Sequence, residues 1–407
     1  MEEINTNKKK IIIIATLSLF LFFLVLLTLL LTRKKQTTNK TTEPVTKIEI
    51  ESNKTDSGNL YQSSKKDEIK KAFIAGLNKP EIAKKTLSCL EKTKNLKGIY
   101  FFQKNCDTKN VCTGTESNHS GLRVIWAYFK SFQKTNNNGD LNKVIRDLKA
   151  YTSVNVIQND FWNCKLMVDL INGKGLNQQD KENAKNICLY SLLRPSMEIE
   201  AEKQIELGLV KLSNLVNIKN KIIKGDKNTI KPLIVKSDVY ETSYYASEFI
   251  GRYHINKQPE ELRKAEFFFD QATIILIKEQ SIDAKSVCTL GEASLDLYKV
   301  NKDKNFLDFA EFLWINKKIY EPNYDFTSKT ICAFFTNDLK SLTKSDKYKK
   351  GENEIIAEAV KNNLDSKTYK LYTNDDGCFN SDNFDSQNRA IKLTSENGLL
   401  SGILLSN

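Results

Sequence analysis

The hydrophobic and polar positions of this chain repeat about every 40 residues as a pair of helices joined by a short turn. Each unit begins with an apolar helix rich in small residues, continues through a turn that carries Asn, Lys, Ser or Asp, and ends with an amphipathic helix. Two copies, at 286–298 and 329–342, place Val287-Cys288 and Ile331-Cys332 at an offset of 44 residues. A period of this length predicts stacked helical hairpins.

The expected helices form an inner and an outer set. Inner helices are expected to begin near residues 119, 158, 241, 285, 329 and 394, and an outer helix follows each of the first five. A further outer-type helix at 80–94 has no inner partner before it, and the last inner helix at 394–405 has no outer partner after it. Joined to each other, these two helices would complete a sixth hairpin and close the chain into an (α/α)6 toroid.

Two other arrangements agree with the same pattern. The long amphipathic segment at 195–235 could add a hairpin and give a ring of seven, or the hairpins could stack into an open solenoid like that of tetratricopeptide repeats. An open solenoid requires polar capping helices at its ends, whereas the last helix of this chain is mostly leucine and isoleucine. The pattern therefore predicts an all-α closed toroid, with the open solenoid as the alternative.

The first 66 residues differ in composition from the rest of the chain. Residues 11–32 hold no charged side chain, lie between two basic clusters and are long enough to cross a bilayer as a helix. A cleavable signal peptide is the alternative, but the apolar run is too long for one and no Ala-x-Ala site follows it. The sequence predicts a cytoplasmic segment at 1–10, a transmembrane signal-anchor at 11–32, a disordered tether at 33–66 and a helical domain at 67–407.

The eight cysteines all follow the apolar segment, which indicates an oxidising compartment and places the domain outside the cytoplasm. Buried thiols in a reduced interior are the alternative. In the closed ring four disulfides are expected. They pair Cys288 with Cys332, Cys164 with Cys188, Cys106 with Cys112, and Cys89 with Cys378. The last of these bonds would join the two ends of the ring.

Charge and metal-ligand content narrow the possible partners. The net charge of +12 comes from lysines scattered at helix-surface spacing, without the aromatic residues that mark a nucleic-acid patch, so no nucleic-acid partner is expected. No Cys-x-x-Cys pair occurs and the chain has two histidines, of which His254 is expected to cap the helix that it ends. The sequence therefore predicts no metal ion and no cofactor.

Two loops add a family resemblance to this layout. Lys97-Gly-Ile-Tyr100-Phe-Phe and Asp375-Asp376-Gly-Cys-Phe379 are similar to the Asp-Gly-aromatic loops of the six-hairpin glycosidases. The arrangement of residues 80–407 resembles that superfamily of (α/α)6 carbohydrate-active enzymes, although no stretch carries a family-specific catalytic motif. The resemblance implies a substrate groove at the face where outer helices connect to the N-termini of inner helices.

Carboxyl groups at that face are candidates for glycoside hydrolysis. The reaction needs a protonated acid and an ionised base or nucleophile roughly 5 to 10 Å apart. Candidate pairs are Asp160 with Glu241 and Asp376 with Glu116. An acidic residue just before or within the first turn of a helix is also an ordinary capping residue, which is the structural alternative for each of them.

Substrate binding is expected to involve aromatic side chains at the same face, because an aromatic ring can stack on a sugar. The candidates are Tyr100, Trp162, Tyr244, Tyr324 and the neighbouring Asp325. The sequence thus predicts a membrane-anchored, extracytoplasmic protein that hydrolyses or binds a surface carbohydrate. The alternative is a non-catalytic helical-repeat scaffold that binds a protein or an envelope polymer.

Overall fold

A computed structural model gives the fold of the chain in two units, Met1–Tyr61 and Gln62–Asn407, and all residues that it describes lie in the second. The described residues are 79–94, 98–100, 103–106, 112–113, 120–153, 162–189, 195–208, 214–227, 232–233, 237–279, 283–316, 325–360, 378–379 and 392–406. The cytoplasmic segment, anchor and tether predicted at 1–66 lie outside them. Of the helices within these ranges, none combines the length and apolar character needed to cross a membrane.

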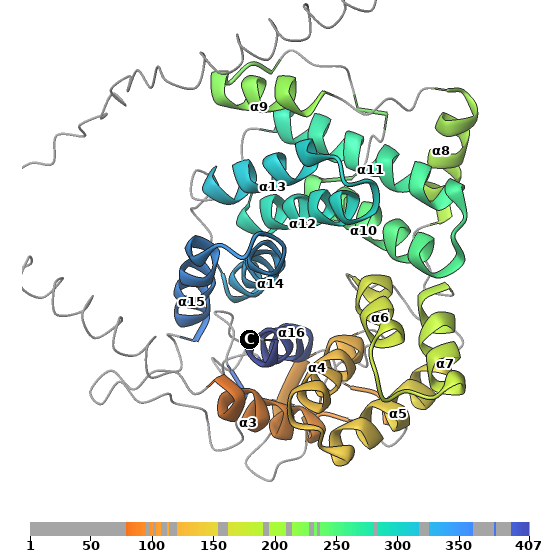
Figure 1. Ribbon diagram of the computed structural model, residues 1–407, viewed down its shortest axis with the longest axis vertical. Helices are drawn as coiled ribbons and strands as arrows, with labels where there is room; N and C mark the ends of the chain where they lie inside the picture. The colour runs from red at the N-terminus through yellow and green to blue at the C-terminus, as the bar shows by residue number, and fades with distance from the viewer. Residues whose placement is uncertain are drawn as a thin grey trace, which may run out of the picture. The chain divides into compact units, whose positions relative to one another are not determined.

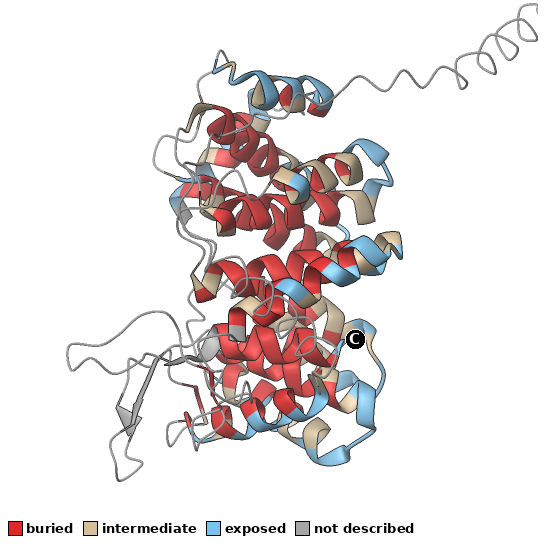
Figure 2. Ribbon diagram, turned by 90° about the vertical axis from the view of Figure 1, so that its left-hand side faces the viewer, coloured by how far each residue is buried: buried red, intermediate tan, exposed pale blue. Residues whose placement is uncertain are grey.

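Six inner helices form a closed ring in the second unit (Figure 1). In chain order they are α4 (Ser120–Thr135), α6 (Asn163–Asn172), α10 (Val239–Asn256), α12 (Ala284–Asn301), α14 (Phe326–Thr343) and α16 (Thr394–Leu405). Each helix contacts the next, and α16 contacts α4, which closes the circle. Figure 2 shows that these helices are buried along much of their length.

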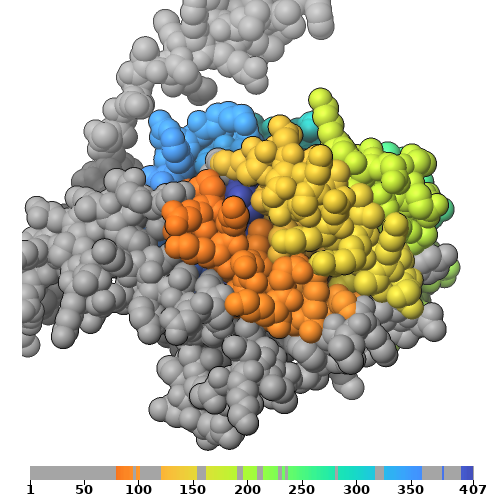
Figure 3. Space-filling model, turned by 90° about the horizontal axis from the view of Figure 1, so that it is seen from below, coloured from red at the N-terminus to blue at the C-terminus, as the bar shows by residue number. Residues whose placement is uncertain are grey.

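Six outer helices complete the hairpins. They are α5 (Asn138–Thr152), α7 (Gln178–Leu189), α11 (Pro259–Lys278), α13 (Lys304–Asn316), α15 (Asp346–Val360) and α3 (Lys79–Glu91). The outer helix α3 packs against α16, so the two ends of the domain form the sixth hairpin. Seen from below, α16 (dark blue) is enclosed by the N-terminal part of the domain (orange and yellow; Figure 3). The predicted closed toroid is confirmed, and the open solenoid is wrong.

Two further helices lie outside the ring. They are α8 (Pro195–Glu206) and α9 (Leu215–Lys224). The first packs against α11, and the second packs against α11 and α13, both of which are outer helices. Because neither adds an inner helix, the alternative of a seven-hairpin ring is wrong for the described part of 195–235.

A small antiparallel sheet departs from the all-helical prediction. Its strands are β1 (Gln103–Cys106), β2 (Cys112–Thr113) and β3 (Lys392–Leu393), in the order β2-β1-β3. The pairing of β1 with β3 joins the N-terminal part of the domain to the segment before α16, so it supports the closure of the ring. In the register of β1 and β2, Cys106 lies opposite Cys112, as the predicted disulfide between them requires.

Three disulfides join the other predicted cysteine pairs. Cys164–Cys188 links α6 to α7, Cys288–Cys332 links α12 to α14, and Cys89–Cys378 links α3 to the segment before α16. The last bond spans 289 residues of sequence, and both of its cysteines are buried. The ring is therefore held at its closure by a covalent bond as well as by helix packing.

Glycines allow the inner helices to approach each other closely. A Cβ atom added to Gly251 of α10 would lie 2.9 Å from the backbone carbon of Cys164 on α6. A Cβ on Gly398 of α16 would lie 2.9 Å from the backbone nitrogen of Val124 on α4. Side chains larger than hydrogen would force these helices apart, which explains the small residues of the inner-helix pattern.

The same capping scheme recurs at three inner helices. Asp238, Asp283 and Asp325 each precede a helix and accept a hydrogen bond from a backbone N–H three residues further on. At the other end of these helices the C-cap is a lysine with left-handed backbone, with φ of 59° at Lys257 and 60° at Lys302. These matched ends produce the period that is visible in the sequence.

Lys302→Gly is expected to stabilise the domain by about 1 kcal/mol, because a Cβ in the left-handed region is strained and glycine removes that strain. Urea unfolding followed by circular dichroism measures the change. Lys84→Gly, in the interior of α3, is the control and is expected to destabilise the domain by about 1 kcal/mol. A loss of stability for Lys302→Gly comparable to that of the control would contradict the prediction.

Candidate functional site

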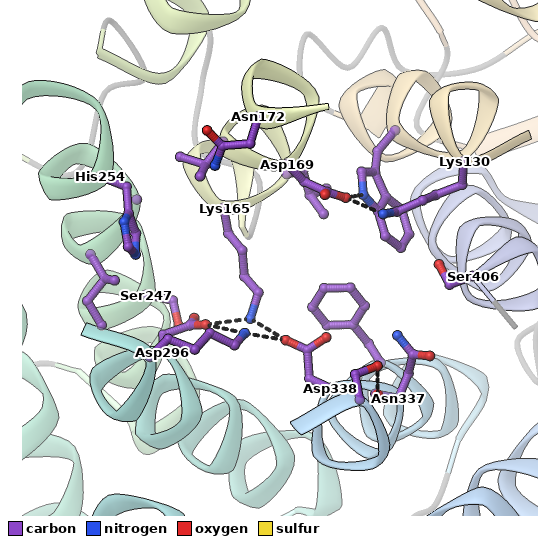
Figure 4. Close-up of a pocket in the computed structure, with 18 of the residues that line it drawn as sticks. Lys130, Lys165, Asp169, Asn172, Ser247, His254, Asp296, Asn337, Asp338 and Ser406 are labelled. Carbon is purple, nitrogen blue, oxygen red and sulfur yellow. Dashed lines mark hydrogen bonds and ion pairs between the residues drawn. The ribbon is translucent and has the colours of Figure 1, made fainter. Parts of the chain in front are cut away.

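A cavity of about 700 Å³, here called the ring cavity, lies inside the inner ring. Side chains from α4, α6, α10, α12 and α14 line it, and Leu405 contributes from α16 (Figure 4). Most lining residues belong to the C-terminal halves of these helices, such as His254, Lys299 and Ser341. The ring cavity therefore lies toward the C-terminal ends of the inner helices. The sequence analysis expects the substrate groove at the other end of the ring, at the inner-helix N-termini.

One wall of the ring cavity carries a cluster of two lysines and three carboxylates, called the lysine–carboxylate cluster, and all of its members except Glu292 line the cavity. Its members are Lys165 of α6, Glu292, Asp296 and Lys299 of α12, and Asp338 of α14. Lys165 Nζ pairs with Glu292, lies 2.8 Å from Asp296 Oδ1 and lies 3.2 Å from Asp338 Oδ2. Lys299 Nζ lies 3.1 Å from Asp296 Oδ1 and 2.5 Å from Asp338 Oδ2. The cluster thus connects three inner helices.

Burial and charge pairing act together on the protonation of this cluster. Burial lowers the pKa of Lys165, although carboxylates surround its ammonium group. Burial alone would raise the pKa of Asp338, but Lys299 and Lys165 outweigh it and hold that pKa well below its usual range. Burial alone would lower the pKa of Lys299, but Asp338 and Asp296 outweigh it and raise that pKa. At neutral pH Asp338 and Lys299 are therefore an ionised pair.

The opposite wall carries a second charged group, formed by α4 and α6. Asp169 Oδ2 accepts a hydrogen bond of 2.7 Å from the indole Nε1 of Trp126 and lies 2.6 Å from Lys130 Nζ. The same Lys130 Nζ lies 5.6 Å from the centre of the Trp126 ring, a cation–π distance. The pairing of Asp169 with Lys130 and Trp126 fixes the orientation of the indole beside the ring cavity (Figure 4).

Several buried polar atoms of the ring cavity wall have no hydrogen-bond partner among the described residues. They are Ser247 Oγ of α10, Asp296 Oδ2 of α12 and Asn337 Oδ1 of α14. An unsatisfied buried polar atom costs about 1 to 3 kcal/mol, so such atoms call for water or a ligand. Two of the three are acceptor atoms, since one is a carboxylate oxygen and the other is an amide carbonyl oxygen. A ligand that supplies O–H donors would match them.

The three carboxylates of the cluster also have the spacing of a metal site. One oxygen of each of Glu292, Asp296 and Asp338 lies within 4.8 Å of the others. The ammonium groups of Lys165 and Lys299 already contact these carboxylates. A divalent cation would have to displace or approach two positive charges, so the donor set does not fit one.

The carboxyl candidates from the sequence have other partners or lie elsewhere. Glu241 is in the first turn of α10, where its side chain accepts hydrogen bonds from Tyr245 Oη and Ser237 Oγ. Asp325 caps α14 by accepting a hydrogen bond of 2.8 Å from the N–H of Ser328. Asp325 therefore has the capping role, whereas Asp238 caps α10 in place of Glu241, and the predicted roles of both residues in a site stay predictions. Asp160, Asp376, Glu116 and Tyr324 lie outside the described residues.

The aromatic candidates are packed inside the domain. Trp162 is wholly buried and stacks on Phe334 with ring centres 4.8 Å apart. Tyr100 is also buried, and its hydroxyl donates a hydrogen bond of 2.9 Å to Asp147 Oδ2. Tyr244 is 1% exposed. These three rings are buried in this structure, and their assignment as stacking platforms for sugars stays a prediction.

Sequence reasoning missed the residues that line the ring cavity. Their signal is the presence of charged side chains within apolar inner helices, as with Asp296 and Lys299 after the apolar start of α12. In a sequence, charged residues that recur at helical spacing are also typical of a solvent-exposed helix face. In the closed ring the same face points inward, toward Lys165 and Asp338 (Figure 4).

Comparison with solved structures defines the class of fold. The α-1,6-mannanase of glycoside hydrolase family 76 from Salegentibacter sp. HEL1_6 matches 81% of this chain and 98% of its own, with 13% identity and a TM-score of 0.51. A family 76 mannosidase from Bacteroides thetaiotaomicron VPI-5482 matches 81% and 97%, with 11% identity and a TM-score of 0.50. The Lin0763 protein from Listeria innocua matches 81% and 97%, with 12% identity and a TM-score of 0.51.

These matches extend over nearly the whole length of the solved proteins, so they concern the complete ring. No protein-family model and no curated protein sequence matches the chain. The chain shares the (α/α)6 toroid fold of these solved proteins, which is the fold that the resemblance implies.

Proposed function

We propose that this protein binds a carbohydrate in the ring cavity. The observation that carries the proposal is the set of buried polar atoms that find no protein partner on three of the inner helices, at Ser247, Asp296 and Asn337. A saccharide has many hydroxyl groups, each of which can donate and accept. The indole of Trp126, on the wall opposite Asp296, lines the same cavity and supplies apolar surface for the sugar ring.

Binding agrees with the described geometry better than hydrolysis does. A general acid needs a raised pKa, and such carboxyl groups occur in apolar surroundings without a cationic partner. The carboxyl groups that line the ring cavity within the described ranges are Asp169, Asp296 and Asp338, and a lysine contacts each of them. The predicted pairs Asp160 with Glu241 and Asp376 with Glu116 each include at least one residue outside the described ranges, so their catalytic role stays a prediction.

Fold likeness supports the choice of ligand class. The two family 76 proteins act on mannosides by their names, and an inactive variant of the mannanase was solved in complex with α-1,6-mannotetrose. At identities of 11 to 13% the likeness to these proteins shows the fold alone. The proposal for this chain therefore rests on its own cavity, and mannosides serve as the first probes.

We further propose that the domain is held at the outer face of a membrane. The charge-free segment 11–32 supports an anchor, and the segment 33–66 is suited to act as a tether. The three disulfides within the domain support an oxidising compartment. A carbohydrate of the cell surface or envelope would then be within reach of the ring cavity.

One observation favours the scaffold alternative. Large apolar side chains are exposed on the two helices outside the ring, Ile199 on α8 and Val216 and Ile223 on α9, the last being 70% exposed. Val216 and Ile223 are seven residues apart, so they lie on one face of α9. Such a face fits a protein partner. The test is a pull-down with the wild-type protein and with Ile223→Glu. A protein partner that the variant no longer retains, while saccharide binding stays intact, would identify protein binding through α9 as a second function.

Isothermal titration of the purified full-length chain in detergent tests the carbohydrate proposal. The ligands are oligosaccharides of the α-1,6-mannan, β-1,4-glucan and chitin series. Asn337→Leu removes one cavity acceptor with little change in volume, and we expect it to weaken binding about tenfold, as the loss of one or more hydrogen bonds predicts. Asn217→Leu, on the exposed surface of α9, is the matched control and is expected to bind normally.

Two results would overturn the proposal. One is the absence of binding in every saccharide series. The other is equal binding by Asn337→Leu and the wild-type protein, with both folded by circular dichroism, because a ligand in the ring cavity must contact this wall.

A further inference from the structure

A second, smaller cavity adjoins the ring cavity. It has a volume of about 250 Å³ and lies among α6, α7 and α10. Val168 and Asn172 of α6 and His254 of α10 line both cavities. The three shared residues place the two spaces next to each other, against the same side chains of α6 and α10. We call the smaller space the side cavity.

We propose that the side cavity is a second subsite, and that the ligand is a saccharide chain that runs from the ring cavity between α6 and α10 to the surface of α7. This inference rests on the proposed function, and it adds that the bound saccharide is an oligomer long enough to fill both cavities. It implies a ligand of several units, one end of which lies inside the ring.

The size of the side cavity supports this assignment. Sites for small ligands generally have volumes of about 300 to 1,000 Å³. The ring cavity, at about 700 Å³, lies in this range, whereas the side cavity, at about 250 Å³, lies below it. The side cavity is therefore better suited to extend an occupied site than to hold a ligand alone.

The wall of the side cavity has the chemistry of a saccharide subsite. Gln178, Lys181, Glu182 and Lys185 of α7 face Ile171 and Ile255 across it. Glu182 and Lys185 are an ion pair of 3.4 Å with both side chains about 40% exposed. Amide, ammonium and carboxylate groups next to aliphatic side chains can bind hydroxyls and cover the apolar face of a sugar.

The junction of the two cavities is polar on both sides. Asn172 is the last residue of α6, and His254 lies near the end of α10 (Figure 4). Burial lowers the pKa of His254, so its imidazole is neutral at pH 7. A neutral imidazole offers one donor and one acceptor, and the amide offers both as well. A sugar unit that passes between them would meet hydrogen-bonding groups on each side.

The test compares ligand lengths in the saccharide series that the full-length protein binds. Isothermal titration is carried out with the monosaccharide and with the two-, four- and six-unit oligomers. We expect the affinity to rise about tenfold or more from one unit to four, as one or two added hydrogen-bonded contacts predict. The double variant Gln178→Ala with Lys181→Ala is expected to remove this gain and to change monosaccharide binding less than twofold.

Gln179→Ala is the matched control. Gln179 is the neighbouring residue on α7, it is exposed like Gln178, and it is not part of the side cavity wall. The proposal is overturned if the tetramer binds no more tightly than the monosaccharide, or if Gln179→Ala weakens tetramer binding as much as the double variant does. In both cases the ring cavity would remain a saccharide site. Absence of binding for every length would instead overturn the proposed function itself.

Discussion

Lys165→Met is expected to lower the free energy of unfolding by about 3 to 5 kcal/mol at pH 7, the range measured when one partner of a buried ion pair is removed. Lys165 contacts the three carboxylates of the lysine–carboxylate cluster, and Glu292 among them is fully buried. Without this lysine, Lys299 alone would face three negative charges inside the ring. Urea unfolding of the full-length chain measures the loss.

Two further variants test whether the loss of stability comes from the buried charges of the cluster. Lys85→Met removes an exposed ion pair with Glu81 on α3 and is expected to change stability by less than about 1 kcal/mol. Glu292→Gln, added to Lys165→Met, restores the original difference between negative and positive charges and is expected to recover part of the loss. If Lys165→Met unfolds like the wild-type protein, the cluster does not stabilise the ring.

Replacement of Cys89 and Cys378 by alanine is expected to destabilise the domain by about 5 kcal/mol, the value that chain entropy gives for so long a loop. The bond spans 289 residues and joins α3 to the segment before α16. Without this bond the unfolded chain has a higher conformational entropy, which favours unfolding. The hairpin of α16 and α3 is then held by helix packing without a covalent bond. Thermal unfolding under non-oxidising conditions and hydrogen exchange in α3 measure the effect.

The Cys164–Cys188 bond provides the comparison. It spans 24 residues, so its removal by alanine substitution is expected to cost about 3 kcal/mol in the same treatment. Faster exchange in α3 should follow only the loss of the Cys89–Cys378 bond. Equal losses for the two pairs, with no local change in α3, would show that the bond between the ends does not hold the ring closed.

The ring could be predicted because its cause is local and repeated. Inner helices expected near 241, 285 and 329 begin at Val239, Ala284 and Phe326, each after a capping aspartate. The same local signals recur in these three hairpins, so each one supports the others. The strands could not be predicted in this way. They are two to four residues long, and β1 pairs with β3 from the other end of the domain.

The site was harder to predict because its residues depend on the closed geometry. Glu241 and Asp325 attract attention in a sequence because they stand near helix starts; in the structure Asp325 caps α14 and Glu241 accepts a hydrogen bond from Tyr245, and their predicted roles in a site stay predictions. Lys165 and Asp338 come from helices that are far apart in the chain. Only the curvature of the ring brings them within 3.2 Å. The spacing along one helix contains no information on that distance.

The turns beside the ring cavity have a consequence for how its specificity can evolve. At the ends of α10, α12 and α14 the chain passes to the next helix through two residues, as in Lys257-Gln258 and Lys302-Asp303. These three described connections are too short to fold over a ligand, so the cavity wall that they adjoin is preformed and loses little ordering entropy on binding. New ligand preferences can then arise by substitution on the inner helices, where each change also alters the packing of the ring, or on α7 at the side cavity.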